Sequence, residues 1–490
     1  MRASSPALIA LARMAGSYRC QYGGPTRLQN HREKMTTFAS TGSWHAEVRA
    51  LLHLAAPLIV NSLSIAGMQF ADAVMAGRLG AEPLAAVAVG ASVWFLGFTV
   101  CLGLMMALSP IAARHYGAGE SRLIGRYTRQ GILLAVLLGT TIMTLTWLLA
   151  EPGLTVLGID EGFRLTTVGY VHAIMLGAPA ICVFLAFRFT TEGIGHTRPI
   201  MYTSLFALVC NVFLNYVFIY GHFGAPRLGA VGCGVASAIT MWLMMVLLGG
   251  YVMLNSRYRP LQIFRRVPHP RLPILKEILI LGAPIAVTIT AESGLFSAVS
   301  ILIGTLGAEI TAAHQIAINF ASTMFMVPLA LSAATTIRIG HALGAGNPGA
   351  ARFSGITGIS VCAGFMTCSA AFLLLFRDAV VSLYTSDPSV TAIAISLLFM
   401  AAIFQIADGV QIGAAGALRG YKDTRIPMVI NTFAYWVLAF PLAYMAAITF
   451  RAPPSYIWGG FVLGLSVAAL LLTIRYGRVS RRELCFRTSE

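Results

Sequence analysis

The sequence contains few charged residues for its length. Only 11% of its 490 residues are Asp, Glu, Lys or Arg, whereas soluble domains carry about 25%. Apolar residues make up 57% of the chain, and the mean hydropathy is +0.77. There are too few polar side chains to cover so much apolar surface. The composition therefore excludes a soluble globular protein and indicates a membrane protein with many spans.

The motifs of several membrane enzymes and channels are also missing. The sequence has no GxxxxGK[ST] run, no HExxH or GxSxG stretch, and no ladder of arginines like that of a voltage sensor. These absences exclude nucleotide hydrolysis by this chain and argue against a membrane hydrolase or a gated channel. The eight cysteines show no CxxC spacing and mostly lie in apolar segments. We expect them to pack as small apolar residues, without a disulfide framework or a zinc site.

After Trp44 the chain divides into twelve apolar runs, each long enough to cross a membrane as a helix. We therefore predict an all-α polytopic membrane protein with twelve transmembrane helices. Four of the runs contain a proline, where membrane helices usually bend: Pro57, Pro284, Pro328 and Pro441. The predicted spans are 52–77, 84–109, 130–150, 166–187, 200–220, 229–254, 278–303, 310–336, 354–376, 390–416, 426–449 and 456–474.

Residues 1–44 differ in composition from the rest of the chain. They carry five Arg, one Lys and a single Glu, and their apolar stretch SPALIALARMAG is too short to span a membrane. Three interpretations are open: a cleaved signal, which lacks a small-residue cleavage site, an Arg-rich transit peptide, or a disordered extension upstream of a natural start at Met35. We favour the third, in which residues 1–34 are not part of the mature protein.

Basic residues fall mainly on one side of the predicted membrane. With the N-terminus in the cytoplasm, the six inner segments after the first span contain 22 Lys and Arg, and the outer loops contain five. This asymmetry follows the positive-inside rule, so both termini are predicted to be cytoplasmic. The net charge of +16 is spread over these short inner segments. It therefore does not indicate a nucleic-acid partner.

Three of the 18 acidic residues lie within predicted spans: Asp72, Glu292 and Asp408. A charged side chain at the centre of a membrane helix costs about 2.5–3.5 kcal/mol or more, so each of these acids needs an explanation. We expect no permanent ion pair, because no Lys or Arg lies deep in a predicted span. The structural alternative is a protonated acid that hydrogen-bonds to a neighbouring helix.

The second half of the chain repeats the first at an offset of 227 residues. The sequence LGAE at 79–82 recurs at 306–309, and the sequence GAG at 117–119 recurs at 344–346. Each half contains six predicted spans, so the halves are parallel repeats related by an axis along the membrane normal. The predicted organisation is an N-terminal extension 1–44, an N-lobe 45–254, a basic cytoplasmic linker 255–277, a C-lobe 278–476 and a cytoplasmic tail 477–490.

The three acids are not repeated. The positions that correspond to them in the other half are all aliphatic: Val299, Ile65 and Ile181. A structural role would more readily have been duplicated with the scaffold. The asymmetry therefore favours a functional role for the acids, and twelve spans with duplicated halves and unpaired acids indicate secondary active transport.

Neighbouring polar residues strengthen this interpretation. Asn211 and Asn215 are four residues apart, so both amides lie on one face of the fifth predicted helix. Together with the carboxylate of Asp72 they would offer oxygen ligands for a small cation or a proton-linked network. Packing between helices is the alternative use of such asparagines, and spacing does not show whether Asp72 faces them. Glu292 and Asp408 could form a second, paired acidic site.

Two histidines in apolar runs, His172 and His314, are expected to pack as neutral imidazoles. The GAG sequences are expected to form tight turns.

Five longer motifs occur in a fixed order: MQFADAVMAGRLGAEPLAAVAVG, GLMMALSPIAARHYGAGE, NYVFIYGHFGAPRLGAVGCG, ITAAHQIAINF and GALRGYKDTRIP. Together they resemble the MATE (multidrug and toxic compound extrusion) transporters, in particular the bacterial NorM-type branch, over residues 46–475.

The resemblance implies two six-helix lobes around a central cavity that opens alternately to each side of the bacterial inner membrane. It implies no enzymatic activity, but export of organic, often cationic, drugs and dyes by antiport with Na+ or H+. The family's N-lobe cation site falls on Asp72, Asn211 and Asn215, and its C-lobe site falls on Glu292 and Asp408. Each site is a candidate for Na+. Relatives with an acid at the second asparagine position have a different N-lobe arrangement. The coupling ion of those relatives therefore does not indicate the coupling ion of this chain.

Gln315 and Phe325 match positions near the family's cavity. We expect a monomer in contact with membrane lipid, without a nucleic-acid partner and without a cofactor besides the coupling ion. One alternative is a flippase of lipid-linked precursors from the same superfamily, which would need cations in its cavity to hold a pyrophosphate. A second alternative, from another class, is an ion channel or a membrane enzyme.

Overall fold

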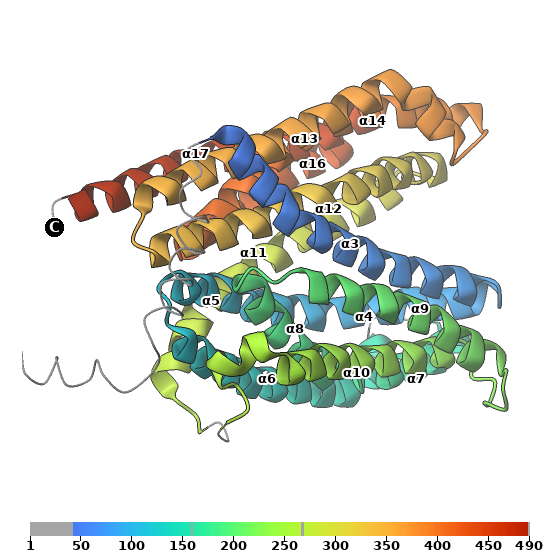
Figure 1. Cartoon of the computed structure of the whole chain (residues 1–490). Helices are drawn as coiled ribbons and strands as arrows, with labels where there is room; N and C mark the ends of the chain where they lie inside the picture. Colours follow the sequence, from blue (N-terminus) through green and yellow to red (C-terminus); the bar gives the residue numbers. More distant parts are fainter. Residues whose placement is uncertain (1–42, 157, 159, 266–268, 489–490) are drawn as a thin grey trace, which may run out of the picture.

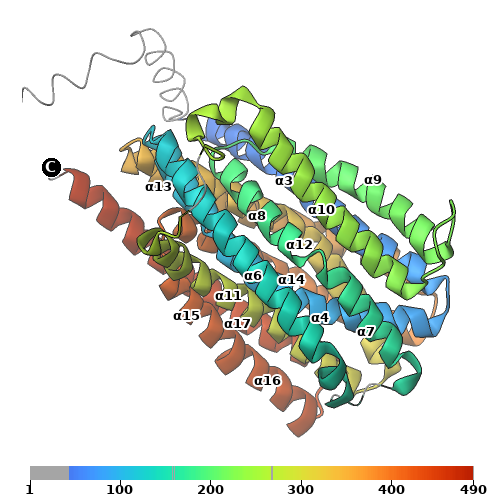
Figure 2. The same cartoon turned by 90° about the horizontal axis from the view of Figure 1, so that it is seen from below.

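The computed structural model describes residues 43–156, 158, 160–265 and 269–488, and these residues form helices joined by short turns (Figures 1 and 2). The predictions for the start of the chain lie outside this part. Three short elements are η1 (Ser256–Leu261) and the π-helical η2 (Ala434–Ala439) and η3 (Met445–Thr449). The α-helices are α3 (Trp44–Gly77), α4 (Ala81–Met106), α5 (Leu108–Gly117), α6 (Ser121–Val156), α7 (Glu161–Met175), α8 (Ala178–Gly193), α9 (Arg198–Tyr220), α10 (Ala230–Leu254), α11 (Leu272–Gly304), α12 (Ala308–Gly344), α13 (Pro348–Ser382), α14 (Pro388–Gly420), α15 (Arg425–Phe433), α16 (Phe440–Tyr444) and α17 (Pro454–Thr488).

The predicted all-α fold with twelve spans is confirmed. In the described residues, 11 helices are long and apolar enough to cross a membrane, and the bent pair of α7 and α8 makes a twelfth span. Most helices run beyond the apolar segment that predicted them, because polar residues continue the helix outside the membrane core. The first helix begins at Trp44 instead of residue 52, so Glu47, which we placed before the first span, is a buried residue of α3.

The two halves form two bundles that lie against each other, with α3 running between them (Figure 1). We call α3–α10 the N-lobe and α11–α17 the C-lobe. One end of the molecule holds η1, the start of α3 and the end of α17, and we call it the linker end. The repeat also appears in backbone geometry: Gly119 and Gly346, in the two GAG turns, have φ of 74° and 81°. Glycine adopts this left-handed conformation without steric cost, which explains its recurrence in both turns.

Small residues bring the lobes into close contact near the linker end. A Cβ atom on Gly103 of α4 would lie 2.3 Å from the Cα of Ala286 in α11. A Cβ atom on Gly344 of α12 would lie 2.0 Å from the carbonyl oxygen of Arg114 in α5. Backbone meets backbone at these points, where no side chain fits. The lobes are therefore packed tightly together at this end.

Helix α3 joins the lobes. Its second half packs on α9 of the N-lobe, and its first half packs on α12 and α13 of the C-lobe. In the first half, Glu47 forms a buried ion pair with Arg338 of α12, with 2.5 Å between Oε2 and Nη2. The hydroxyl of Ser354 in α13 donates a further hydrogen bond of 2.6 Å to Glu47. Because Asp72 lies in the second half of α3, one helix connects this acid to an ion pair between the lobes.

Candidate functional site

A cavity of about 580 Å³ lies between the lobes. Its walls come from α3, α4 and α8 of the N-lobe and from α11, α12, α14 and α15 of the C-lobe. Most of the lining is apolar and includes six aromatic rings: Phe95, Phe98, Phe189, Phe296, Phe325 and Phe404. Five lining residues are ionisable: Arg188, Glu192, Glu292, Asp408 and Arg419. A cavity with this lining suits a drug-sized amphipathic molecule.

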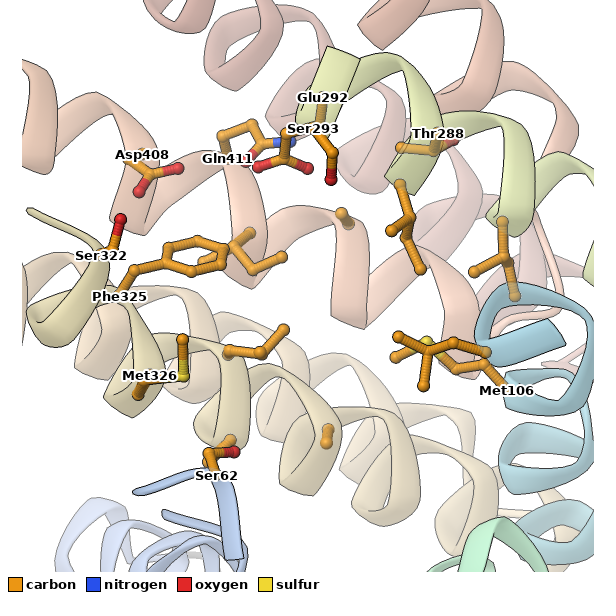
Figure 3. A pocket seen from close by; sticks show the side chains of 18 of the residues that line it. Ser62, Met106, Thr288, Glu292, Ser293, Ser322, Phe325, Met326, Asp408 and Gln411 are labelled. Carbon is orange, nitrogen blue, oxygen red and sulfur yellow. The ribbon is translucent and has the colours of Figure 1, made fainter. Parts of the chain in front are cut away.

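The structure brings two of the predicted acids together in the C-lobe. Glu292 of α11 and Asp408 of α14 both line the cavity, and Figure 3 shows their side chains directed to the same open space. Two carboxylates that face one apolar cavity repel each other when both are ionised. In the described part of the chain, neither has a basic side chain within 4.0 Å. The pair is therefore available to a cation or a proton.

Neutral polar groups near these acids were not predicted. Gln411 of α14 donates a hydrogen bond of 2.9 Å to the hydroxyl of Tyr435, and both residues are buried. The side-chain oxygen of Gln411 and both amide atoms of Asn431 are buried without a hydrogen-bond partner. Asn431 lines the cavity close to the start of η2, and π-helical segments are frequent at functional sites. Buried amides without partners are costly, so these oxygens are candidate ligands beside the two carboxylates.

The third predicted acid forms a separate site in the N-lobe. The amide nitrogen of Asn215 in α9 donates to Oδ1 of Asp72 at 2.6 Å and to Oδ1 of Asn211 at 3.2 Å. Ser237 of α10 donates to the second Asp72 oxygen at 3.1 Å. The side-chain oxygen of Asn215 is buried without a partner. Asp72, Asn211 and Asn215 therefore converge, as the family resemblance implied, and they lie outside the lining of the cavity.

Two basic residues reach the cavity, although no Lys or Arg lies deep in a predicted span. Arg188 of α8 and Arg419 of α14 line the cavity, although the sequence placed them in inner segments. Both belong to the extended linker-end turns of their helices. The cavity therefore has a basic region as well as an acidic one. Neither arginine forms an ion pair within 4.0 Å with Asp72, Glu292 or Asp408 in the described residues.

Of the two remaining residues predicted to lie near the cavity, one lines it and the other does not. Phe325 lines the cavity, as Figure 3 shows. Gln315 is not among the lining residues; its side chain is exposed, and its amide donates to Oδ1 of Asn319 at 3.3 Å. Gln315 lies ten residues from Phe325 in α12, about 15 Å along the helix and about 80° around its axis, so the two side chains do not share one face.

The predicted packing of His172 and His314 is confirmed. Trp458 donates to Nδ1 of His314 at 3.2 Å, which leaves Nε2 to donate to the hydroxyl of Ser300 at 3.0 Å. This arrangement requires a neutral imidazole. His172 packs against the ring of Trp147, with 4.7 Å between the ring centroids. The cysteines of the described residues are free thiols, and most of them are buried.

His196, which lies outside the spans, has a shifted pKa. His196 lies in the turn between α8 and α9, and its Nε2 accepts a hydrogen bond from Arg257 at 2.5 Å. Burial, together with the positive charges of Arg257 and Arg198, lowers the pKa of His196 from 6.5 to about 4. His196 is therefore neutral near pH 7. It is not a candidate for the proton site.

Comparison with known proteins agrees with this architecture. The sequence profile of the MatE family matches the chain twice, at residues 57–217 and 284–445. The chain is 40% identical over 441 residues to the multidrug resistance protein PmpM of Pseudomonas aeruginosa, which covers 89% of this chain and 92% of PmpM. It is 38% identical over 445 residues to the multidrug resistance protein NorM of Vibrio vulnificus, which covers 89% of this chain and 96% of NorM. Among solved structures, the eukaryotic MATE transporter AtDTX14 is similar with a TM-score of 0.80 and 22% identity, over 90% of this chain and 98% of that chain. This chain therefore belongs to the MATE family of transporters.

Proposed function

We propose that this chain exports amphipathic organic compounds, including drugs and dyes, from bacteria by antiport with Na+ or H+. One observation carries the proposal: an apolar cavity between duplicated lobes is combined with two carboxylate sites that, among the described residues, have no basic partner within 4.0 Å. The cavity suits varied organic molecules, and each carboxylate site can exchange a cation with water. The names of the two bacterial relatives, both multidrug resistance proteins, support this function.

In this proposal the linker end faces the cytoplasm. The excess of Lys and Arg in the segments at that end, 22 against five in the other loops, supports this orientation. The tight contacts of Gly103 with α11 and of Gly344 with α5 then close the cavity on the cytoplasmic side. The conformation is one in which a substrate cannot return to the cytoplasm. Transport requires these contacts to separate in the opposite state.

The exchange rests on competition between substrate and ion. Ionised Glu292 and Asp408 attract a cationic substrate, whereas Na+ or a proton on these groups weakens that attraction. At the N-lobe site, a bound ion neutralises the carboxylate of Asp72, which accepts hydrogen bonds from Asn215 and Ser237. Helix α3 links this site to the Glu47–Arg338 ion pair between the lobes. Each ligand can shift the balance of the two states only by its difference in affinity for them.

Two other functions were considered. A flippase of lipid-linked precursors needs cations for a pyrophosphate, and Arg188 and Arg419 supply two. Glu292 and Asp408 would nevertheless repel the pyrophosphate, which favours the exporter. An ion channel needs a continuous path, which the packed linker end opposes. We also propose that the chain is not an enzyme, in line with its relatives.

The experiment is efflux of a fluorescent cationic dye from vesicles that contain the purified full-length chain, with Na+ and proton gradients imposed separately. We expect dye movement under at least one gradient, and its loss in the variants Asp72→Asn, Glu292→Gln and Asp408→Asn. If all three variants keep full efflux under either gradient, the mechanism is wrong. An electrical leak without dye exchange would instead indicate a channel.

A further inference from the structure

Two arginines of the cavity are not used by the proposed exchange. Arg419 is only 9% exposed, and its guanidinium donates to the hydroxyl of Ser332 at 2.9 Å and to the sulfur of Met106 at 3.1 Å. A hydroxyl and a thioether are weak acceptors for a charge that is shielded from water. In the described residues, Arg419 forms no ion pair within 4.0 Å. The protein therefore offers these donors only weak acceptors.

Arg188, which belongs to the N-lobe, also has a hydrogen-bond donor without an acceptor. Its Nε is buried without a hydrogen-bond partner, and Glu192, one turn along the same helix, lies 4.0 Å away. The guanidinium also lies over the ring of Phe189, 5.3 Å from its centroid. Among the described residues, neither Glu192 nor Glu292 forms an ion pair with Arg419 within 4.0 Å. The region can therefore accept an additional negative charge.

Asp408 and Arg419 lie at different depths of one cavity. Arg419 follows Asp408 by 11 residues in α14, which is close to three helical turns, so the two side chains leave the same face of the helix. Gln411 and Ala415, which lie between them on that face, also line the cavity. A rise of 1.5 Å per residue separates the two Cα atoms by about 16 Å. One wall of the cavity thus carries an acid at one level and a base at another.

We propose that the preferred substrates are amphipathic zwitterions with a carboxylate that binds to Arg419 and Arg188. Their protonated amine lies towards Glu292 and Asp408, and their apolar body contacts the aromatic lining. The inference rests on the proposed function as an exporter. A guanidinium binds a carboxylate through paired hydrogen bonds, which a hydroxyl and a thioether cannot supply. A simple cation would satisfy only the acidic level and leave Arg419 without a strong acceptor.

A matched pair of dyes tests this inference: a rhodamine with a free carboxylate, which is a zwitterion, and its methyl ester, which is a cation with the same ring system. Fluorescence polarisation gives the affinity of the detergent-solubilised full chain for each dye, and reconstituted vesicles give transport. The variants are Arg419→Gln and Arg188→Gln, with Arg419→Lys to keep the charge. Arg126→Gln is the control, because Arg126 is exposed on α6 and does not line the cavity.

We expect Arg419→Gln to lower the ratio of zwitterion affinity to ester affinity by about tenfold, since one charge-assisted interaction is lost. Arg188→Gln should lower the ratio in the same direction, Arg419→Lys should restore part of it, and Arg126→Gln should leave it unchanged. An unchanged ratio in both glutamine variants would overturn the inference, as would an equal loss of both dyes, which would assign Arg419 to the packing of the lobes. If the unmodified chain transports neither dye, the proposed function itself fails.

Discussion

The side-chain amide of Asn215 donates a hydrogen bond of 2.6 Å to the carboxyl group of Asp72, and this contact joins α9 to α3. Asp72 also accepts from Ser237 of α10, so three helices of the N-lobe meet at one acid. The side-chain oxygen of Asn215 has no partner although it is buried. Two neighbouring side chains thus supply a carboxylate and an amide oxygen without a partner, and both are oxygen ligands suited to a small cation. Five predictions follow from this site, its C-lobe counterpart and the contacts between the lobes.

The variant Asp72→Asn should abolish coupling without unfolding the protein. An amide has the shape of the carboxyl group and keeps hydrogen bonds to Asn215 and Ser237, but it cannot exchange a proton or neutralise Na+. We expect efflux to fall by at least about tenfold, with the melting temperature in detergent almost unchanged. The control is Asp378→Asn, because the side chain of Asp378 is 78% exposed. Equal efflux in both variants would contradict the role of Asp72.

Glu292 and Asp408 should act as one unit. Because both carboxyl groups face the same cavity and interact electrostatically, we expect them to share one coupling ion. Glu292→Gln and Asp408→Asn should each reduce efflux strongly, and the double variant should be no worse than either single one. The measurement is a double-mutant cycle on initial efflux rates. Additive losses would mean that the two acids bind separate ions.

The variant Gly344→Val should open the linker end. A Cβ atom at Gly344 would lie 2.0 Å from the carbonyl oxygen of Arg114, so any side chain must push α12 away from α5. We expect loss of efflux and faster hydrogen exchange in 108–117, measured by mass spectrometry. Gly364→Val is the matched control, because a Cβ atom there has no neighbour within 4 Å. Unchanged exchange in the Gly344 variant would show that these helices do not close the cavity.

The ion pair between Glu47 and Arg338 should dominate the stability of the contact between α3 and the C-lobe. Removal of one partner leaves the other charge buried, which costs about 3–5 kcal/mol. We therefore expect Glu47→Gln or Arg338→Met to lower the melting temperature clearly. The double variant Glu47→Leu with Arg338→Met should recover much of the loss, because no unpaired charge remains. A double variant less stable than either single one would contradict this explanation.

His196 should make the protein less stable in acid. Its pKa in the folded protein, about 4, is below the ordinary 6.5, so the unfolded chain binds a proton more readily. Stability from this group is present above pH 6.5 and is lost as the pH falls towards 4. In His196→Gln the melting temperature should depend less on pH within this window. An identical dependence in both proteins would show that the Arg257 contact does not hold the imidazole neutral.

Hydropathy was sufficient to predict the helices, because membrane spans are long and apolar whatever their tertiary contacts. Spacing was sufficient to place Asn211 and Asn215 on one face, but only the fold shows that Asp72 lies opposite them. The sequence did not predict that Arg188 and Arg419 line the cavity. They were assigned to inner segments because the apolar runs end near them, whereas the helices continue and carry both side chains into the cavity.

The neutral partners were missed for a different reason. Ser237, Gln411 and Asn431 carry no charge, so a search for charged residues within the spans passes over them. A search for buried amides and hydroxyls in the same spans would have found them, although not their contacts. The repeat predicted the two related GAG turns, but not that Gly344 packs against Arg114 of the other lobe, since that contact depends on how the halves pack.

The most direct test of the central claim is a simultaneous recording of dye and ion movement in vesicles that contain the full chain. The vesicles start with equal Na+ and H+ concentrations on both sides of the membrane. An outward dye gradient should then drive inward movement of Na+ or H+, and Asp72→Asn should abolish this ion movement. We expect the two fluxes to start together and to keep a constant ratio as the dye gradient is varied. Dye movement without any ion movement, or ion movement that does not depend on dye, would contradict the proposed exchange.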